Sequence, residues 1–332
     1  MNKVLITGVA GFIGCNLAKR LTSEGYTVIG IDDLNTLNDG PMKLKRLASL
    51  GVIPSIEKKI TAGNSTFLFQ QISINDELAM QYLFKHHTFD SVIHLAAHAG
   101  IRNSLKYPQQ FLSSNVLGFE VLLRCCRDFH VNNVLFASSS SVYGNRTGSS
   151  AFKEGDKTDS PMSVYAASKK ADELLAHAYA SLYGLAITGL RFFTVYGPWV
   201  RTDMATYLFM DSIKHNRPIT LFNKGDMLRD FTYVDDVVNV VSLLLKRPHG
   251  VNKGSLELLN VGNETVVRLA DFVAVLERLI GRLAEKIYQP IQAGDVPMTH
   301  ANTSRLREQI GYVPETVIED GLKKTVDWYL QQ

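Results

Sequence analysis

Residues 3–14 read KVLITGVAGFIG, and this stretch decides the fold. A short apolar run leads directly into a turn with three glycines, Gly8, Gly11 and Gly14, and a helical pattern follows. Glycines at this spacing permit a tight turn, let the backbone approach a pyrophosphate, and let the helix pack closely on the strand. The start of the helix offers free N–H groups and a positive dipole end to a phosphate. The stretch therefore predicts the first strand–turn–helix unit of a dinucleotide-binding fold.

An acidic residue ends the second expected strand and indicates which dinucleotide is bound. A carboxylate at Asp32 can accept hydrogen bonds from both ribose hydroxyls of NAD, whereas it would repel the 2′-phosphate of NADP. No basic residue stands next to it in the sequence, since Asp33, Leu34 and Asn35 follow. The sequence therefore favours NAD, and Asn35 is either a cofactor contact or a plain turn residue.

Short apolar runs alternate with helical patterns through the first half of the chain. Runs rich in Val, Ile and Leu predict strands at 3–7, 27–32, 66–71, 91–95, 133–138 and 186–192. Helical spacing predicts helices at 12–24, 76–86, 109–129 and 164–183. This alternation is typical of an α/β protein with a Rossmann-type, doubly wound parallel sheet covered on both faces. We also expect residues 42–50 to form a charged helix that faces solvent.

The regular alternation of strand and helix patterns ends after about residue 196, where prolines separate shorter elements. We expect residues 1–190 to form mainly the NAD-binding domain and residues 191–332 mainly a smaller α/β lobe that binds the substrate. A length of 332 residues agrees with two domains, at roughly 150 residues per domain. We expect the two to be interleaved rather than joined by a linker.

Composition restricts the partners and the compartment. Lys plus Arg number 35 and Asp plus Glu number 32, which gives a net charge of +3. So small a charge, with 45% apolar residues, favours a globular protein that binds neither nucleic acid nor a membrane surface. Three cysteines provide neither a disulfide framework nor a metal-ligand spacing. We therefore expect a cytoplasmic protein without a bound metal.

Two side chains one helical turn apart carry candidate chemistry. Tyr165 and Lys169 stand at i and i+4 in the expected helix 164–183, so they share one face. The pKa of a free tyrosine is about 10, and a nearby ammonium favours the phenolate. Such a phenol can take the proton from a sugar hydroxyl while a hydride leaves for NAD.

The serine run 138–141 follows a strand, where ligands of parallel sheets bind, and one of its hydroxyls can hold the reacting oxygen. We expect two of the four serines to serve only the turn.

With these motifs the chain resembles the extended short-chain dehydrogenase/reductase family, which includes NAD-dependent nucleotide-sugar epimerases and dehydratases. The likeness extends from residue 3 to about residue 328. It implies that Tyr165, Lys169 and Ser139 are the catalytic residues. The cofactor-binding set that it implies is Gly8, Gly11, Phe12, Ile13, Gly14, Asp32, Asn35, Ser73, Ile74, Leu95, Ala96, Ala97, Tyr165 and Lys169.

Within that family, four stretches are most similar to UDP-glucuronate 4-epimerases: 97–104, 191–205, 225–233 and 290–297. The likeness places the carboxylate of the sugar against Thr194, Ser140 and Ser141. It places the UDP diphosphate against Arg201 and Arg229, since a planar guanidinium can hold phosphate oxygens in two parallel bonds. The substrate-binding set that it implies is Arg102, Ser139, Ser140, Ser141, Thr194, Arg201, Arg229 and Asp295.

Several positions depart from the family pattern. Ser73 stands where an Asp usually holds the adenine, and His98 stands where Gln is common. Val200 and Thr202 replace the Gly and Pro that usually flank the substrate arginine, and Asn302 replaces an Asp. None of these changes removes a catalytic group, but together they leave the exact UDP-sugar open.

The resemblance implies C4 epimerisation of a UDP-sugar, most of all UDP-glucuronate to UDP-galacturonate, by transient oxidation to a 4-keto sugar with bound NAD. Open alternatives are an epimerase for UDP-glucose or an N-acetylated sugar, a nucleotide-sugar 4-ketoreductase or decarboxylase, and a non-catalytic NAD-sensing regulator. A 4,6-dehydratase is disfavoured, because Ser140 and Ser141 stand where Asp-Glu is usual. By the same likeness we expect a homodimer formed by the helices at 109–129 and 164–183, and a role in polysaccharide biosynthesis.

Overall fold

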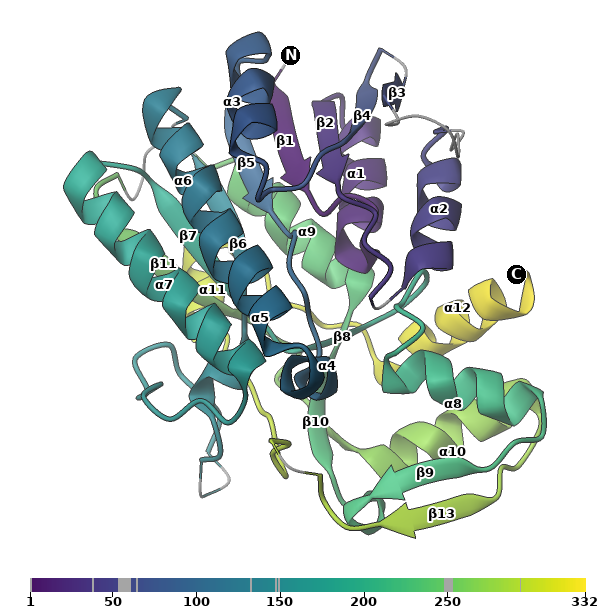
Figure 1. The fold of residues 1–332 in the computed structure, drawn as a ribbon. Helices are drawn as coiled ribbons and strands as arrows, with labels where there is room; N and C mark the ends of the chain where they lie inside the picture. The colour runs from purple at the N-terminus through teal and green to yellow at the C-terminus, as the bar shows by residue number, and fades with distance from the viewer. Residues whose placement is uncertain are drawn as a thin grey trace.

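The computed structural model describes residues 2–37, 39–52, 61–63, 65–131, 133–146, 148, 150–247, 253–292 and 294–332, with only the backbone of 61–63. Its main element is a parallel sheet (Figure 1). In the described ranges seven parallel strands lie in the order β11-β7-β6-β5-β1-β2-β4, and the short β3 pairs antiparallel with β4 at the edge. The strands are β1 (Lys3–Thr7), β2 (Thr27–Asp32), β3 (Thr61–Gly63), β4 (Phe67–Gln71), β5 (Ser91–His94), β6 (Val134–Ser139), β7 (Ile187–Phe192) and β11 (Leu256–Val261).

Both faces of this sheet are covered by helices. Val4 and Ile6 of β1 belong to one buried core and Leu5 belongs to another, because successive side chains of a strand point to opposite faces. The first core includes α1, α2 and α9, and the second includes α3, α6 and α7 (Figure 1). These helices are α1 (Phe12–Ser23), α2 (Gly40–Ser49), α3 (Glu77–His86), α6 (Gly118–Asp128), α7 (Val164–Tyr183) and α9 (Val234–Leu245). The layers confirm the expected Rossmann-type α/β fold.

The helix expected at 109–129 is interrupted. A short helix, α5 (Pro108–Phe111), leads into a π-helical segment, η1 (Leu112–Leu117), before α6 begins. Asn115 in η1 is buried, and its amide donates to the backbone oxygen of His98 at 3.0 Å and to Ser168 Oγ at 2.9 Å. The wider π turn lets this polar side chain hold the segment that follows β5. The expectation of one regular helix was therefore wrong at this point.

Helix α2 forms where the charged segment 42–50 predicts a helix, but it does not simply face solvent. Arg46 is fully buried and lies 2.5 Å from Asp39, while Lys43 Nζ lies 2.8 Å from Asp32. The expectation of a solvated helix was wrong for these two side chains. A buried charge requires a partner, and helical spacing alone does not reveal carboxylates that approach from neighbouring segments.

A smaller lobe lies beyond the carboxyl ends of the main strands (Figure 1). Strand β10 pairs with β8 and β12, and β9 pairs with β13. The chain crosses between the lobes more than once, since β11 returns to the main sheet. The remaining elements are α4 (Ile101–Lys106), β8 (Thr194–Tyr196), α8 (Ala205–Lys214), β9 (Ile219–Phe222), β10 (Leu228–Tyr233), β12 (Val266–Arg268), α10 (Leu269–Ile280), β13 (Lys286–Gln289), α11 (Ser304–Ile310), α12 (Ile318–Leu330) and the 3₁₀ turns η2 (Ser140–Tyr143) and η3 (Asn223–Gly225).

None of the helices described above has both the length and the apolar character needed to cross a bilayer. Among the described residues, no group of three or more His, Cys, Asp or Glu converges as metal ligands would. The three cysteines, Cys15, Cys125 and Cys126, are buried thiols.

Candidate functional site

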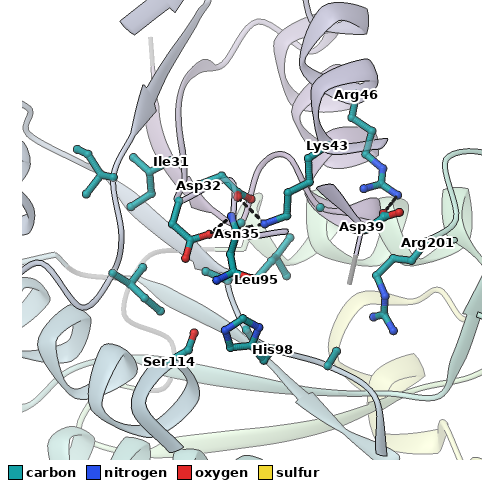
Figure 2. A pocket seen from close by; sticks show the side chains of 18 residues that line it. Ile31, Asp32, Asn35, Asp39, Lys43, Arg46, Leu95, His98, Ser114 and Arg201 are labelled. Carbon is teal, nitrogen blue, oxygen red and sulfur yellow. Dashed lines mark hydrogen bonds and ion pairs between the residues drawn. The ribbon is translucent and has the colours of Figure 1, made fainter. Parts of the chain in front are cut away.

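Two adjoining pockets open at the carboxyl ends of the main strands, where open parallel sheets bind their ligands. The smaller one lies over the ends of β1 and β2 and is drawn in Figure 2. The larger is a cavity of about 740 Å³ that extends toward the second lobe, a size suited to a sizeable organic ligand. Together they are lined by every predicted site residue except Ser73.

The glycine turn is built so that only glycines fit. Gly8 has φ +72°, and a Cβ added there would lie 2.7 Å from the backbone nitrogen of Ala96. A Cβ at Gly14 would collide with the carbonyl oxygen of Gly8, which accepts a hydrogen bond from the Gly11 N–H at 2.9 Å. Helix α1 then begins at Phe12 without a side-chain cap and without an acidic residue in its first turn. Its N–H groups therefore point freely toward a bound anion.

Asp32 lies at the end of β2, nearly buried, as the sequence predicts for a ribose ligand. Its Oδ1 accepts from the Leu34 N–H at 2.9 Å and lies 2.8 Å from Lys43 Nζ. Lys43 also lies 3.6 Å from Asp33 Oδ1. The inference that no basic residue stands beside Asp32 holds along the sequence but is wrong in space, because α2 folds back over the end of β2. The ammonium partly neutralises the carboxylate and weakens its repulsion of a 2′-phosphate.

Apolar side chains form part of the lining of the smaller pocket. Ile74 is buried and lines the smaller pocket, as do Leu95, Ala96 and Ala97 after β5. Ser73 does not line either pocket, and its Oγ accepts from the Asn75 N–H at 3.3 Å. The structure therefore brings together the other predicted cofactor residues but leaves Ser73 outside the lining.

Tyr165, Lys169 and Ser139 meet in the larger cavity. Tyr165 and Lys169 come from the first two turns of α7, whose N-cap Ser163 accepts from the Ala166 N–H at 3.1 Å. Ser139 is the last residue of β6, and its Oγ accepts from both the N–H and the hydroxyl of Ser141, at 3.2 and 2.9 Å. The three residues predicted as catalytic therefore line one cavity.

Two neighbours of this triad carry charge that the sequence reading missed. Lys169 Nζ lies 3.1 Å from Asp172 Oδ2, and neither side chain is more than 2% exposed. Burial raises the pKa of Asp172 to about 6, although the Lys169 ammonium opposes the rise. Ser138 donates to Glu173 Oε1 at 2.7 Å, so this serine belongs to a buried network that borders the larger cavity. A carboxylate three residues after the lysine was the available signal for Asp172.

Three arginines line the larger cavity: Arg201 and Arg229 come from the second lobe, and Arg102 comes from α4, which follows β5. Arg201 donates to Asp203, with Nε 2.9 Å from Oδ1, and Arg229 donates to Asp295 Oδ1 at 2.7 Å. Burial alone would lower the pKa of Arg201, but the Asp203 carboxylate leaves it raised. Arg102 of α4 lies over the Phe222 ring, 5.1 Å from its centroid. The remaining predicted substrate residues, Ser140, Ser141 and Thr194, line the same cavity.

Comparisons with known proteins agree with this geometry. The family model for the NAD dependent epimerase/dehydratase family matches residues 4–262. Protein CapI of Staphylococcus aureus is 43% identical, and the match covers 99% of this chain and 98% of that protein. A UDP-glucuronate 4-epimerase of Thermodesulfobacterium geofontis is 40% identical, with 99% and 96% covered.

Solved structures are similar over the whole chain as well. The crystal structure of UDP-glucuronic acid 4-epimerase from Bacillus cereus, in complex with UDP-glucuronic acid and NAD, has a TM-score of 0.88 and 31% identity. That match covers 99% of both chains. With its glycine turn, its Tyr–Lys–Ser cluster and these matches, the chain belongs to the NAD dependent epimerase/dehydratase family.

Proposed function

We propose that this protein is an NAD-dependent epimerase that interconverts UDP-glucuronate and UDP-galacturonate by inverting C4 of the sugar. The observation that carries the proposal is a single cavity in which Tyr165, Lys169 and Ser139 lie with three arginines at the end of a dinucleotide crevice. The similarity of nearly the whole chain to UDP-glucuronate 4-epimerases supports a uronic acid as the sugar.

The residues present fit NAD. The cradle at Gly8 and Gly14, which a Cβ would fill, and the uncapped start of α1 suit a pyrophosphate. Asp32 suits a ribose, and Leu95 to Ala97 provide an apolar wall for the nicotinamide. Bound there, NAD would accept a hydride from C4 of the sugar and later return it. Because hydride leaves and returns, the reaction needs no net oxidant.

The proton is assigned to Tyr165. Its phenolate takes the proton of the 4-hydroxyl as C4 is oxidised, and it returns this proton when C4 is reduced on the opposite face. The Ser139 hydroxyl donates a hydrogen bond to O4 throughout, and Lys169 supplies the positive charge that favours the phenolate. Between the two half-reactions the 4-keto sugar turns in the cavity while the diphosphate stays in place.

The arginines and hydroxyls are assigned to the two ends of the substrate. Arg201 and Arg229 hold the diphosphate, with Asp203 and Asp295 orienting their guanidinium groups. Thr194, with Ser140 and Ser141, holds the carboxylate. The oxidised intermediate is a β-keto acid, so these hydroxyls must keep the carboxylate from aligning with the ketone, or CO₂ would be lost.

A homodimer is part of the proposal. Exposed leucines gather on the neighbouring elements η1 and α7, with Leu117 63%, Leu174 60% and Leu182 73% exposed. Large apolar side chains that are this accessible on adjacent helices favour burial against a second copy. The site itself lies within one chain.

The proposal also assigns a ligand to each part of the chain, a compartment to the enzyme and a reaction class to its product. We assign residues 1–190 mainly to NAD and 191–332 mainly to the nucleotide sugar, in a cytoplasmic enzyme that binds no nucleic acid and no membrane. UDP-galacturonate is an activated uronic acid, so a glycosyl transfer into polysaccharide is the reaction class that would consume it.

The deciding experiment incubates the purified protein with UDP-glucuronate, UDP-glucose and their N-acetylated relatives, with products resolved by NMR. Formation of UDP-galacturonate without added NAD supports the proposal. If only neutral sugars are turned over, the proposal that Thr194, Ser140 and Ser141 hold a sugar carboxylate is wrong. Release of CO₂ would indicate a decarboxylase. As a control, Tyr165→Phe should abolish interconversion while NAD stays bound, and retained activity would take Tyr165 out of its role.

A further inference from the structure

The loop that carries Arg201 is bonded to the wall of the cofactor crevice through a buried network. Figure 2 shows the ion pair between Asp39 and Arg46 in this network, with Arg201 nearby. Asp39 is the N-cap of α2 and is 5% exposed, and Arg46 lies two turns further along the same helix with no exposure. Both residues line the smaller pocket, as does Arg201. The network therefore borders both halves of the site.

The guanidinium of Arg46 contacts three segments of the chain. Its Nη2 lies 2.5 Å from Asp39 Oδ2. Its Nε and Nη2 both donate to the backbone oxygen of Trp199, at 3.0 and 2.7 Å, and its Nη1 donates to that of Ala10 at 3.2 Å. Ala10 lies within the glycine turn, so one side chain connects that turn to α2 and to the loop before Arg201.

Thr202, which follows Arg201 in the sequence, also bonds to Asp39. Its N–H and its hydroxyl both donate to Asp39 Oδ1, at 3.2 and 2.9 Å. Trp199 has φ +68°, a backbone conformation that is unfavourable for a bulky side chain and is kept here by the bonds to its carbonyl. Trp199, two residues before Arg201, is thus held by Arg46 of α2, and Thr202, directly after Arg201, is held by the N-cap Asp39.

We propose that Thr202, Asp39 and Arg46 are positioning residues that fix Arg201 against the substrate diphosphate and couple its placement to occupation of the NAD site. The role of Arg201 rests on the function proposed above, but the bonds to Asp39 do not. Since α2 also carries Lys43 beside Asp32, a movement of α2 on cofactor binding reaches Arg201 through these bonds. Coupling between sites is reciprocal, so a diphosphate on Arg201 should in turn slow the loss of NAD.

The test compares Thr202→Val, which removes the hydroxyl, with Thr202→Ser, which keeps it. We expect Thr202→Val to raise KM for UDP-glucuronate about five- to tenfold, as for loss of a hydrogen bond to a charged acceptor, with little change in kcat. We also expect added UDP to slow NAD release, measured after rapid gel filtration, less than in the unmodified enzyme. Thr202→Ser should restore both values. Thr265→Val, at an exposed threonine whose hydroxyl makes one 3.5 Å contact, should change neither.

Arg201→Gln separates the two proposals. If Thr202 acts through Arg201, adding Thr202→Val to Arg201→Gln should cause no further loss of UDP affinity in calorimetry, whereas additive losses would overturn the inference. Should Arg201→Gln bind UDP as tightly as the unmodified enzyme, the assignment under the proposed function fails and the inference falls with it. If Arg201→Gln weakens UDP binding but Thr202→Val leaves KM and NAD release unchanged, the inference alone is wrong.

Discussion

The charge balance around Lys169 is set by one carboxylate. Asp172 lies 3.1 Å from the Lys169 ammonium, and both side chains are buried. Glu173 beside it is already engaged by Arg191, whose Nε and Nη2 donate to it at 2.8 and 2.9 Å. Burial raises the pKa of Asp172 from 3.8 to about 6, so above about pH 6 it is an anion that offsets part of the ammonium's effect on Tyr165.

Asp172→Asn tests this balance, because it removes the charge and keeps the shape. We expect the acidic limb of the kcat–pH profile to move about 0.5–1 unit to lower pH, since the ammonium then favours the phenolate without opposition. Below about pH 6 the two profiles should converge, because Asp172 is protonated there in the unmodified enzyme. Asp327→Asn, at an exposed aspartate of α12, is the control. A limb that stays in place would contradict the role of Asp172.

At the scale of elements, the glycine turn decides how closely α1 approaches the sheet. Gly8→Ala adds a Cβ that meets the Ala96 backbone at 2.7 Å in addition to the strain at φ +72°. We expect a loss of about 2–4 kcal/mol in unfolding free energy and loss of bound NAD. Gly281→Ala has nearly the same φ, +76°, but nothing within 4 Å, and should cost only about 1 kcal/mol and keep NAD. If urea denaturation gives the same loss of unfolding free energy for Gly8→Ala and Gly281→Ala, crowding at Gly8 is unimportant.

The end of α1 is held to α9 by a charged contact that predicts a pH effect. Burial favours the neutral form of Glu24, but hydrogen bonds from Arg20, Ser242 and Lys246 prevail and lower its pKa from 4.5 to about 2. A carboxyl with a lowered pKa stabilises the fold above its unfolded value, and this contribution is lost as pH falls through the folded value. Glu24→Gln should therefore cost about 1–2 kcal/mol at pH 7, measured by urea denaturation.

The difference between Glu24→Gln and the unmodified protein should shrink as pH falls from about 4.5 toward 2, where Glu24 becomes protonated. Glu308→Gln, at an exposed glutamate of α11, provides the matched change without these partners. A difference that does not depend on pH would mean that Glu24 acts through packing and not through its charge.

Local patterns predicted the elements of this protein better than its long-range polar contacts. Apolar runs and glycine spacing predicted the turn and six of the seven parallel strands, because these depend on neighbours in the sequence, but they did not predict β11. The pairing of Lys43 with Asp32 and of Arg46 with Asp39 was missed, since a partner that approaches through folding leaves no spacing to read. The π turn at Asn115 was missed for the same reason, because its partners lie in two other segments.

At the scale of the whole molecule, the proposed dimer depends on the exposed leucines of η1 and α7. Leu174→Glu places a charge in that surface, where desolvation without a partner is costly. We expect the unmodified protein to sediment at twice the 36.9 kDa mass of the chain and Leu174→Glu to shift toward the single-chain mass. Leu283→Glu is the matched control, because Leu283 is 85% exposed but lies after α10, away from both elements. A single-chain mass for the unmodified protein, or an unchanged dimer in Leu174→Glu, would contradict this interface.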